Sequence, residues 1–386
     1  MKHDVNILYK RTVFMSIMPQ PESHPIILHP VKGRGALSRL PHRFTIDARE
    51  TFDDGWGDPD AAEDAPPPVT EVLLEDARSA IATNDSPDIP FDYTVNPYRG
   101  CEHGCIYCFA RPTHSYLGFS PGLDFETKIV AKRNVAELLA RELAAPRYRP
   151  SPINIGAATD AYQPVERALR LTRGVVEVLA RSRHPFTLVT KSSGVERDLD
   201  LIAPHAAQRL AAVYVTITTL DARLARILEP RAAAPARRLA TIRALAAAGV
   251  PVGVSVAPQI PFINEDMEQV LDAARAAGAR RAFYTVLRLP WELSPLFREW
   301  LAAHFPDRAE RVMARVRELR GGKDYDSAWA QRMHGQGVWA ELLRQRFAKA
   351  SRRLGLTGER NGLALDRFDP AALRAQGELF GRDGFL

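Results

Sequence analysis

Hydrophobic and polar positions along the middle of the chain follow two periods in turn, and this predicts a series of strands and helices. Short β-branched runs predict strands, and longer segments with apolar residues three or four positions apart predict helices. The predicted strands are 93–95, 153–156, 186–190, 213–218, 252–256 and 281–286. The predicted helices are 134–143, 171–181, one beginning at 198, 236–248 and 266–277. Strands that alternate with helices at this spacing pair in parallel.

The pattern changes on both sides of this repetitive region. Residues 47–68 are acidic and end in three prolines, so we expect residues 1–69 to be largely disordered. The folded repeat should occupy residues 70–290. Residues 291–386 form a predicted helical extension, with helices at 293–305, 308–319 and 338–354. No apolar run approaches the ~20 residues of a membrane span, so no membrane partner is expected.

Charge is uneven along the 386 residues. Residues 1–100 carry 10 Lys and Arg against 16 Asp and Glu, a net of −6, and the remaining residues carry 42 against 30, a net of +12. The basic part suits either an arginine-rich solvated surface or a body that attracts DNA or RNA. The basic helix at 338–354 has the same two interpretations. The stretch Lys32–Ser38, basic and rich in glycine, suits an anion clamp or flexible chain.

The three cysteines of the chain lie close together, with C-x3-C-x2-C spacing, at Cys101, Cys105 and Cys108. An odd number of thiols without a distant partner is not a disulfide framework. The spacing indicates one object held by three sulfurs. A structural zinc ion would need a fourth ligand, such as His103 or His114. A four-iron cluster held by three thiolates leaves one iron open. Three ordinary buried cysteines are the remaining alternative.

The spacing of these cysteines, with Tyr107 before the last one, resembles the signature of the radical S-adenosylmethionine (SAM) enzymes. The resemblance covers about residues 90–290 and implies a [4Fe-4S] cluster on the three cysteines, with Tyr107 at the cofactor site. It implies reductive cleavage of SAM to a 5′-deoxyadenosyl radical that abstracts hydrogen. A reductant such as flavodoxin or ferredoxin and a cytoplasmic location are implied as well.

Six strand–helix units are too few for a closed eight-stranded barrel. They match the α/β architecture of that superfamily, a partial (β/α)6 TIM-type barrel. In such barrels the chemistry lies at the carboxyl ends of the strands. After the second strand, Thr159 and Asp160 stand where many members carry a Gly-Gly-Glu type segment that holds the SAM ammonium. This chain lacks that form, and a helix-capping role is the alternative. The run from Thr159 to Glu166 resembles the branch that contains spore photoproduct lyase.

The next three strands end in further candidates for SAM contacts. Lys191 and Ser192 suit a methionine carboxylate or ribose oxygens, and a solvated lysine is the alternative. Thr216 and Thr218 lie two positions apart and so share a face, near the position of a SAM-binding hydroxyl in the resembling branch. Gly253, in the fifth strand, would allow a ligand to approach closely.

One departure from the resembling branch concerns the return of a hydrogen atom to the product. Spore photoproduct lyase is understood to use a cysteine outside its cluster, and this chain has no fourth cysteine. Tyr162 and Tyr284, near strand ends, are therefore the candidate catalytic residues, with re-abstraction from 5′-deoxyadenosine or simple packing as alternatives. Repair of thymine dimers by the thiol route is not expected. The substrate stays open between a nucleic acid, a protein and a small molecule, and a zinc-stabilised nucleic-acid-binding protein is the non-enzymatic alternative.

Overall fold

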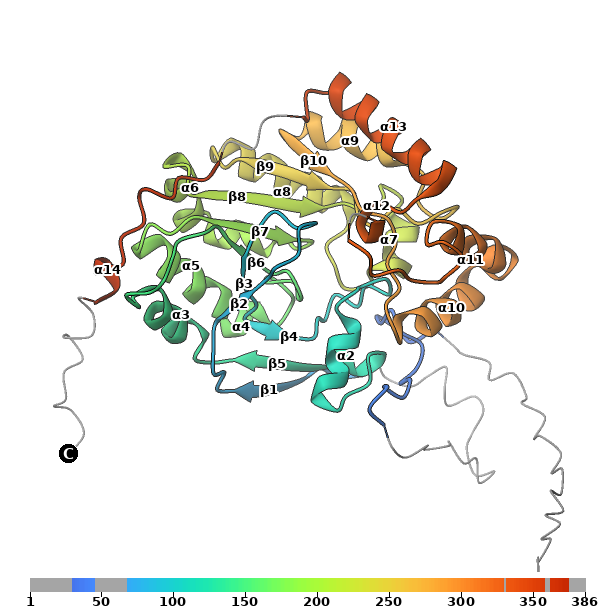
Figure 1. Ribbon diagram of the computed structural model, residues 1–386, viewed down its shortest axis with the longest axis horizontal. Coiled ribbons are helices and arrows are strands. Elements are labelled where there is room, and N and C mark those ends of the chain that lie inside the picture. Colours follow the sequence, from blue (N-terminus) through green and yellow to red (C-terminus); the bar gives the residue numbers. More distant parts are fainter. Residues whose placement is uncertain (1–29, 46–67, 330, 358–361, 375–386) are drawn as a thin grey trace, which may run out of the picture.

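The computed structural model describes residues 30–45, 68–329, 331–357 and 362–374 (Figure 1). These residues form a seven-stranded sheet and a three-stranded sheet, with helices around them. The larger sheet has the strand order β10-β9-β8-β7-β6-β3-β2. Its strands are β2 (Ile81–Thr83), β3 (Tyr93–Val95), β6 (Ile153–Ile155), β7 (Phe186–Thr190), β8 (Ala211–Thr216), β9 (Val252–Ser255) and β10 (Arg281–Phe283).

Six of these strands, β3 and β6 to β10, pair in parallel in chain order, and β2 pairs with β3 in the antiparallel sense. This confirms the predicted parallel α/β fold. The helices that follow the strands are α3 (Val135–Leu143), α4 (Glu166–Leu169), α5 (Leu171–Arg181), α6 (Leu199–Ala207), α7 (Ala222–Leu228), α8 (Pro235–Ala247) and α9 (Met267–Ala276). Helix α5 packs on α3 and α6, and α8 packs on α9. Right-handed crossovers between consecutive strands place such helices on one face of the sheet. The sheet stays open, because β10 and β2 are its edges.

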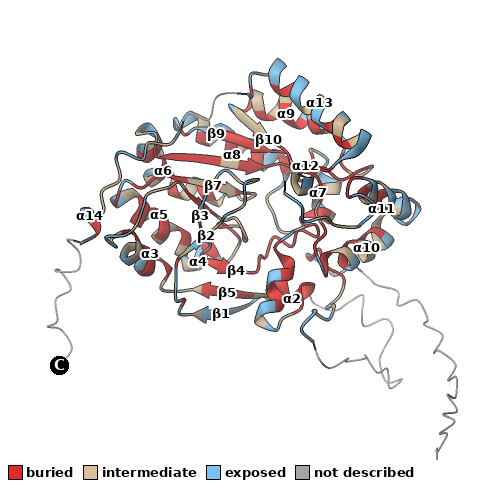
Figure 2. Ribbon diagram, viewed as in Figure 1, coloured by how far each residue is buried: buried red, intermediate tan, exposed pale blue. Residues whose placement is uncertain are grey.

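The two faces of the strands differ in chemistry, as the period of two requires. Apolar residues such as Val95, Ile155, Leu188, Val213 and Val254 belong to the main core, which they form with the helices. Figure 2 shows these strands as mostly buried, with exposed positions on the outer sides of the helices. The opposite face lies away from the helices and is more polar. It carries Thr94, Asn154, Thr187, Thr216 and Ser255.

A three-stranded sheet was not predicted. It has the order β1-β5-β4, with β1 (Glu71–Glu75), β4 (Tyr98–Arg99) and β5 (Lys128–Lys132), and the short helix α2 (Leu123–Thr127) leads into β5. Strand β4 pairs with β5 just before the first cysteine. The Tyr98 ring is buried, and its hydroxyl donates to Glu166 at the start of α4. The small sheet therefore fixes the chain where it enters the cysteine loop.

The carboxyl-terminal part is helical, as expected. It contains α10 (Leu293–His304), η3 (Pro306–Arg308), α11 (Ala309–Glu318), α12 (Gln331–His334), α13 (Gly337–Arg353) and α14 (Ala371–Arg374). Helix α13 packs on α9. Phe297 and Trp300 of α10 belong to a second apolar cluster with Cys105, Ile106 and Tyr107. The helical extension thus contributes directly to the packing around the cysteines. No helix in the ranges described above is long and apolar enough to cross a bilayer.

Residues 30–45, which we call the strap, differ from the disorder expected for residues 1–69. The strap lies against α2 and the cysteine loop, and Ala36 is fully buried. The backbone N–H groups of Gly35 and Ala36 donate to the Glu126 carboxylate over 3.0 and 2.8 Å. The anion that the stretch Lys32–Ser38 clamps is therefore a side chain of the same protein. Residues 1–29 and 46–67 lie outside the described residues.

Candidate active site

The three cysteines lie on the loop that follows β3 and β4. Cys101 and Cys105 are buried, Cys108 is half-buried, and all three are free thiols. Burial, followed by the nearby Asp160 and the other two cysteines, raises the pKa of Cys101. Burial raises the pKa of Cys105 to about 12. Buried thiols become thiolates when a metal replaces their protons, so this loop suits metal binding.

The thiols do not converge on a single point. Within the ranges that the structure describes, no group of three or more His, Cys, Asp or Glu side chains is arranged around the position of one metal ion. Each thiolate of an iron–sulfur cluster binds its own iron, and such a cluster does not require convergence.

A buried arginine holds the backbone of the cysteine loop through hydrogen bonds. Arg111, in the 3-10 helix η1 (Arg111–Leu117), has no exposed surface. Its guanidinium donates to the carbonyl groups of Gly104 and Cys105 over 3.0 and 2.9 Å and forms an ion pair with Glu126. Glu126 in turn holds the strap. Neither residue was singled out from the sequence, because their contacts depend on the tertiary structure and follow no local motif.

The segment after β6 forms further hydrogen bonds with the cysteine loop. The Thr159 hydroxyl donates to the carbonyl of Gly100 over 2.7 Å. The Gln163 side chain donates to that carbonyl over 3.3 Å and accepts from the N–H of Glu102 over 2.9 Å. Thr159 therefore contacts the cysteine loop, and the SAM contact expected for it stays a prediction.

Asp160 has its carboxylate surrounded by donors from this protein. It accepts from the Thr190 hydroxyl and from the N–H of Lys191, both over 2.7 Å, and it lies 3.3 Å from Nδ1 of His103. Burial alone would raise the pKa of Asp160, but the neighbouring His103 and these hydrogen bonds outweigh burial and lower it. The carboxylate thus ties β7 to the cysteine loop. Its expected contact with the SAM ammonium also stays a prediction.

Lys191 follows β7, and its ammonium group lies 5.8 Å from the centre of the Tyr107 ring. Burial would lower the pKa of Lys191, but the nearby Cys105 and Glu229 outweigh burial and raise it. The side chain is therefore a cation, and within the described residues it makes no hydrogen bond or ion pair of its own. Ser192 has a different position: its hydroxyl accepts from the N–H of Gly194 over 3.0 Å and caps η2 (Ser193–Asp198).

A buried polar network lies beside Lys191. The Tyr107 hydroxyl contacts Thr218 over 3.1 Å and donates to Glu229, and Thr218 donates to Glu229 over 2.6 Å. Arg238 of α8 forms an ion pair with the same carboxylate. Burial alone would raise the pKa of Glu229, but Arg238, Lys191 and the hydrogen bonds lower it to about 2. The structure thus joins two predicted residues, Tyr107 and Thr218, through a carboxylate that the sequence did not single out.

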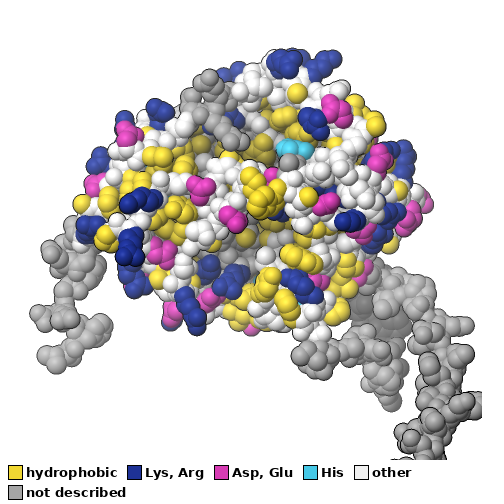
Figure 3. Space-filling view, viewed as in Figure 1, with side chains coloured by type: hydrophobic (Ala, Val, Ile, Leu, Met, Phe, Trp, Pro, Cys, Tyr) yellow, Lys and Arg dark blue, Asp and Glu magenta, His cyan; other side chains and the backbone are white. Residues whose placement is uncertain are grey.

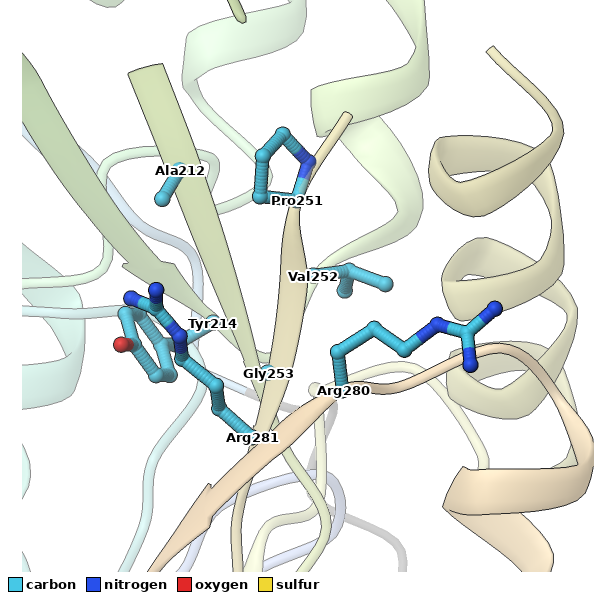
Figure 4. A pocket seen from close by; sticks show the side chains of 7 residues that line it. All are labelled: Ala212, Tyr214, Pro251, Val252, Gly253, Arg280 and Arg281. Carbon is cyan, nitrogen blue, oxygen red and sulfur yellow. The ribbon is translucent and has the colours of Figure 1, made fainter. Parts of the chain in front are cut away.

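The remaining predicted positions lie on β8 and β9. Thr216 is buried at the end of β8, on the polar face, and its carbonyl accepts from Arg238 over 3.0 Å. The expected role of Gly253 is wrong. A Cβ on Gly253 would lie 2.5 Å from the Tyr214 ring. The Tyr214 side chain therefore occupies the space in which a ligand was expected. Figure 4 shows Gly253 in a small pocket with Tyr214 and Arg281, near the amino ends of β8 to β10. The cysteine loop lies at the carboxyl ends of the strands.

The two candidate catalytic tyrosines have partners elsewhere. The Tyr162 hydroxyl donates to Asp198 over 2.9 Å. The Tyr284 ring packs on His334 of α12 and Phe347 of α13, at centre distances of 4.9 and 4.7 Å. The Tyr162 hydroxyl therefore has a carboxylate partner, whereas the Tyr284 ring is packed and its buried hydroxyl has no hydrogen-bond partner within the described residues. The catalytic role of both tyrosines stays a prediction.

Comparison with known proteins identifies the family. The radical SAM superfamily matches residues 95–274, from the end of β3 into α9. Uncharacterised proteins of Mycobacterium tuberculosis and Mycobacterium bovis are 38% identical to this chain over 292 residues, which cover 75% of this chain and 82% of each relative. This chain belongs to the radical SAM superfamily. The resemblance predicted from the cysteine motif is confirmed.

More distant similarities extend to other proteins. An uncharacterised protein of Methanocaldococcus jannaschii is 25% identical over 220 residues, which cover 57% of this chain and 79% of that protein. Among solved structures, spore photoproduct lyase is similar with a TM-score of 0.47 and 16% identity, over 73% of this chain and 78% of that one. Radical SAM proteins are enzymes that use SAM and an iron–sulfur cluster. This chain is therefore an enzyme that uses SAM.

Proposed function

We propose that this radical SAM enzyme binds a [4Fe-4S] cluster through Cys101, Cys105 and Cys108 and cleaves SAM reductively to a 5′-deoxyadenosyl radical. The radical abstracts hydrogen from the substrate. The observation that carries the proposal is the Lys191 ammonium, which is half-buried beside Tyr107 and forms no ion pair within the described residues. Such a cation suits the carboxylate of SAM.

The residues present fit a cluster. Three free thiols lie on one loop that is held by a buried arginine and capped by the strap. When bound, the cluster supplies the electron that cleaves SAM, and the protein supplies binding, orientation and exclusion of water. Lys191 would hold the SAM carboxylate, and the network of Tyr107, Thr218 and Glu229 would keep the surrounding side chains in place. Thr216 and Ser192 offer further polar groups at the same ends of the strands.

The partner and compartment follow from this chemistry. An oxygen-sensitive cluster needs a reducing environment, so we infer a cytoplasmic location and a reductant such as flavodoxin or ferredoxin. The chain has no cysteine outside the motif, and we infer that hydrogen returns to the product from a tyrosine, such as Tyr162 or Tyr284, or from 5′-deoxyadenosine.

DNA or RNA is one substrate class that the basic part of the chain suits. Along α13, however, Arg344, Arg346 and Arg353 pair with acidic residues of the same protein, Glu341, Glu268 and Asp272. Figure 3 shows Lys and Arg spread over the visible face with Asp and Glu among them. Contacts to phosphates release counterions, so binding of a labelled oligonucleotide must weaken steeply as salt rises. Binding that is absent at low salt, or indifferent to salt, removes this class.

The proposed function is tested by anaerobic reconstitution with iron and sulfide, followed by measurement of 5′-deoxyadenosine after SAM and dithionite are added. We expect alanine at Cys101, Cys105 or Cys108 to abolish both the cluster absorbance and SAM cleavage. The exposed change Tyr116→Phe, in η1, is the control and should leave both intact. Full cleavage activity in any of the three cysteine variants contradicts the proposal, and bound zinc without sulfide supports the zinc-protein alternative.

A further inference from the structure

Besides Lys191, a second cation, Arg288, lies near the cysteine loop, on the segment between β10 and α10. Arg288 is mostly buried, and its Nε has neither a hydrogen-bond partner nor contact with solvent. The hydrogen bond that its guanidinium makes goes to the Met333 sulfur, over 3.1 Å, which is a weak acceptor. Within the described ranges no carboxylate forms an ion pair with it.

The surroundings of Arg288 are positive. Arg320 lies nearby, is fully buried, and donates to the carbonyl groups of Leu287 and Gln331 over 2.6 and 2.8 Å, without an ion pair in the described residues. Asp88 is the nearby acidic group, and its carboxylate is held by Arg332 over 2.7 Å. Burial, and then the neighbouring Arg332, lower the pKa of Arg288 despite Tyr325, Cys108 and Asp88, which act in the opposite direction.

Arg288 also lies next to the cysteine loop. Its guanidinium carbon is 4.4 Å from the centre of the Phe109 ring, and Phe109 directly follows Cys108. Phe109 is 45% exposed, so part of its ring is accessible to a ligand. The segment that carries Arg288 is held on both sides, because Val286 donates to the carbonyl of Met333 and Leu287 donates to that of Gln259. Figure 1 shows α12, which carries Met333, close to the carboxyl end of β10. The position of Arg288 is therefore fixed before any ligand arrives.

A buried cation without a counter-ion destabilises the folded state, and such groups persist where they serve a ligand. We propose that Arg288, together with the exposed face of Phe109, forms a subsite for an oxyanion of the substrate, a phosphate or a carboxylate group. The guanidinium would bind two oxygens of that group, and the ring would contact the flat or apolar part next to it. The subsite extends the proposed function, because it places the substrate beside the cysteine loop.

The test uses the reconstituted full-length protein and two probes, potassium phosphate and potassium acetate, at constant ionic strength. A ligand that binds the folded state raises the melting temperature with its concentration. We expect at least one probe to raise it in a saturable way in the wild type. In Arg288→Gln the apparent Kd for the probe should be at least tenfold higher than in the wild type. The melting temperature without probe should be equal to or higher than that of the wild type, since an unpaired buried charge is removed. Arg243→Gln, on the exposed face of α8, is the control and should match the wild type.

Several outcomes would overturn the inference. The inference is wrong if neither probe raises the melting temperature of the wild type. It is also wrong if the response of Arg288→Gln to the probes is unchanged. A shift in the cluster's reduction potential in Arg288→Gln, with unchanged response to both probes, would mean that Arg288 balances the charge of the cluster. If Arg288→Gln does not fold, Arg288→Lys keeps the charge but loses the two-point contact, and it should bind the probe more weakly. The probe that acts at lower concentration distinguishes a phosphate-bearing from a carboxylate-bearing substrate. SAM cleavage is measured separately, so loss of cleavage with intact oxyanion binding would count against the proposed function alone.

Discussion

At the scale of single residues, Glu229 connects the candidate SAM site to the helices around the sheet. Its carboxylate is buried, accepts from Tyr107 and Thr218, and forms an ion pair with Arg238. One carboxylate thus accepts from a phenol and a hydroxyl and neutralises a buried guanidinium. It also contributes negative charge near Lys191, which favours the charged form of that lysine.

Replacing this carboxylate should be costly. In Glu229→Gln the buried Arg238 loses its counter-ion, and we expect a loss of ~3–5 kcal/mol in the free energy of unfolding. The adjacent pair Arg237–Glu196 is the matched control, because its side chains are 45% and 24% exposed, against 2% and 0% for Arg238 and Glu229. Glu196→Gln should therefore cost no more than ~1 kcal/mol. Chemical unfolding of both variants measures the difference, and equal losses would show that the burial of Glu229 has no special consequence.

A second residue-scale prediction concerns Lys191. Lys191→Met removes the half-buried cation but keeps its apolar chain, so the KM for SAM should rise roughly tenfold or more, the usual effect of losing one hydrogen bond to a charged group. The cluster absorbance should not change, because Lys191 is not among the three thiol ligands. Ser192→Ala, which removes a helix cap, should lower stability by ~1 kcal/mol and raise the KM for SAM less than Lys191→Met does, because the Ser192 hydroxyl already accepts from the N–H of Gly194. A KM for SAM that is unchanged in Lys191→Met would contradict the assignment.

At the scale of elements, the sequence predicted those parts of the fold that have a regular hydrophobic period. Helix α5 has the predicted bounds of 171–181, and β7 has those of 186–190. The three-stranded sheet was missed because β4 has two residues and β1 is largely exposed, so neither shows a period. The strap was missed for a different reason. It lacks a hydrophobic pattern, and it is held by contacts such as that of Gly35 with Glu126, 91 residues away.

The candidate site divides in the same way. The cysteines and Lys191 could be singled out as candidates from the sequence, because a motif and a strand end mark them. The roles of Thr159 and Asp160 as braces, and the presence of Arg111 and Glu229, depend on which loops meet in space. The polar character of these residues was visible, but their partners were not.

Packing of the strap on the cysteine loop leads to a prediction for Gly35. A Cβ at this position would lie 1.9 Å from the carbonyl oxygen of Gly104, so Gly35→Ala must displace the strap from the loop. We expect the variant to retain less iron and sulfide per chain and to lose its cluster absorbance faster in air. Gly362→Ala is the control, because a Cβ there meets nothing within 4 Å. Cluster retention equal to that of the wild type would show that the strap does not protect the loop.

At the scale of the whole molecule, two sets of buried groups, histidines and carboxylates, have lowered pKa values and affect stability in different pH ranges. Burial lowers the pKa of His184 to about 4, although its contact with the carbonyl of Pro185 acts in the opposite direction, and burial lowers the pKa of His114 to about 4 as well. Among the carboxylates, the pKa of Glu229 is lowered to about 2 and that of Asp160 is also lowered. The histidines titrate in the unfolded chain near pH 6.5, and the carboxylates near pH 4.

These differences predict how stability depends on pH. Below pH 6.5 the unfolded chain takes up protons at His184 and His114, while the folded protein keeps both rings neutral. Stability is therefore complete above pH 6.5 and falls as the pH decreases toward 4, by roughly 2 kcal/mol for one such histidine at pH 5. The carboxylates cause a further loss of stability below about pH 4, because there the unfolded chain binds protons that Glu229 and Asp160 of the folded protein do not bind.

The variant His184→Gln tests this prediction. In the wild type a ring nitrogen of His184 lies 2.7 Å from the Tyr148 hydroxyl. Glutamine keeps a polar partner for that hydroxyl but does not titrate. This variant should be less stable than the wild type at pH 7.5, and its stability should fall less between pH 7.5 and 5. His42→Gln, on the strap, tests whether any histidine has this effect, and its profile should follow the wild type. Urea unfolding of the three proteins at several pH values measures the slopes, and an equally steep decline in His184→Gln would exclude His184 as the cause.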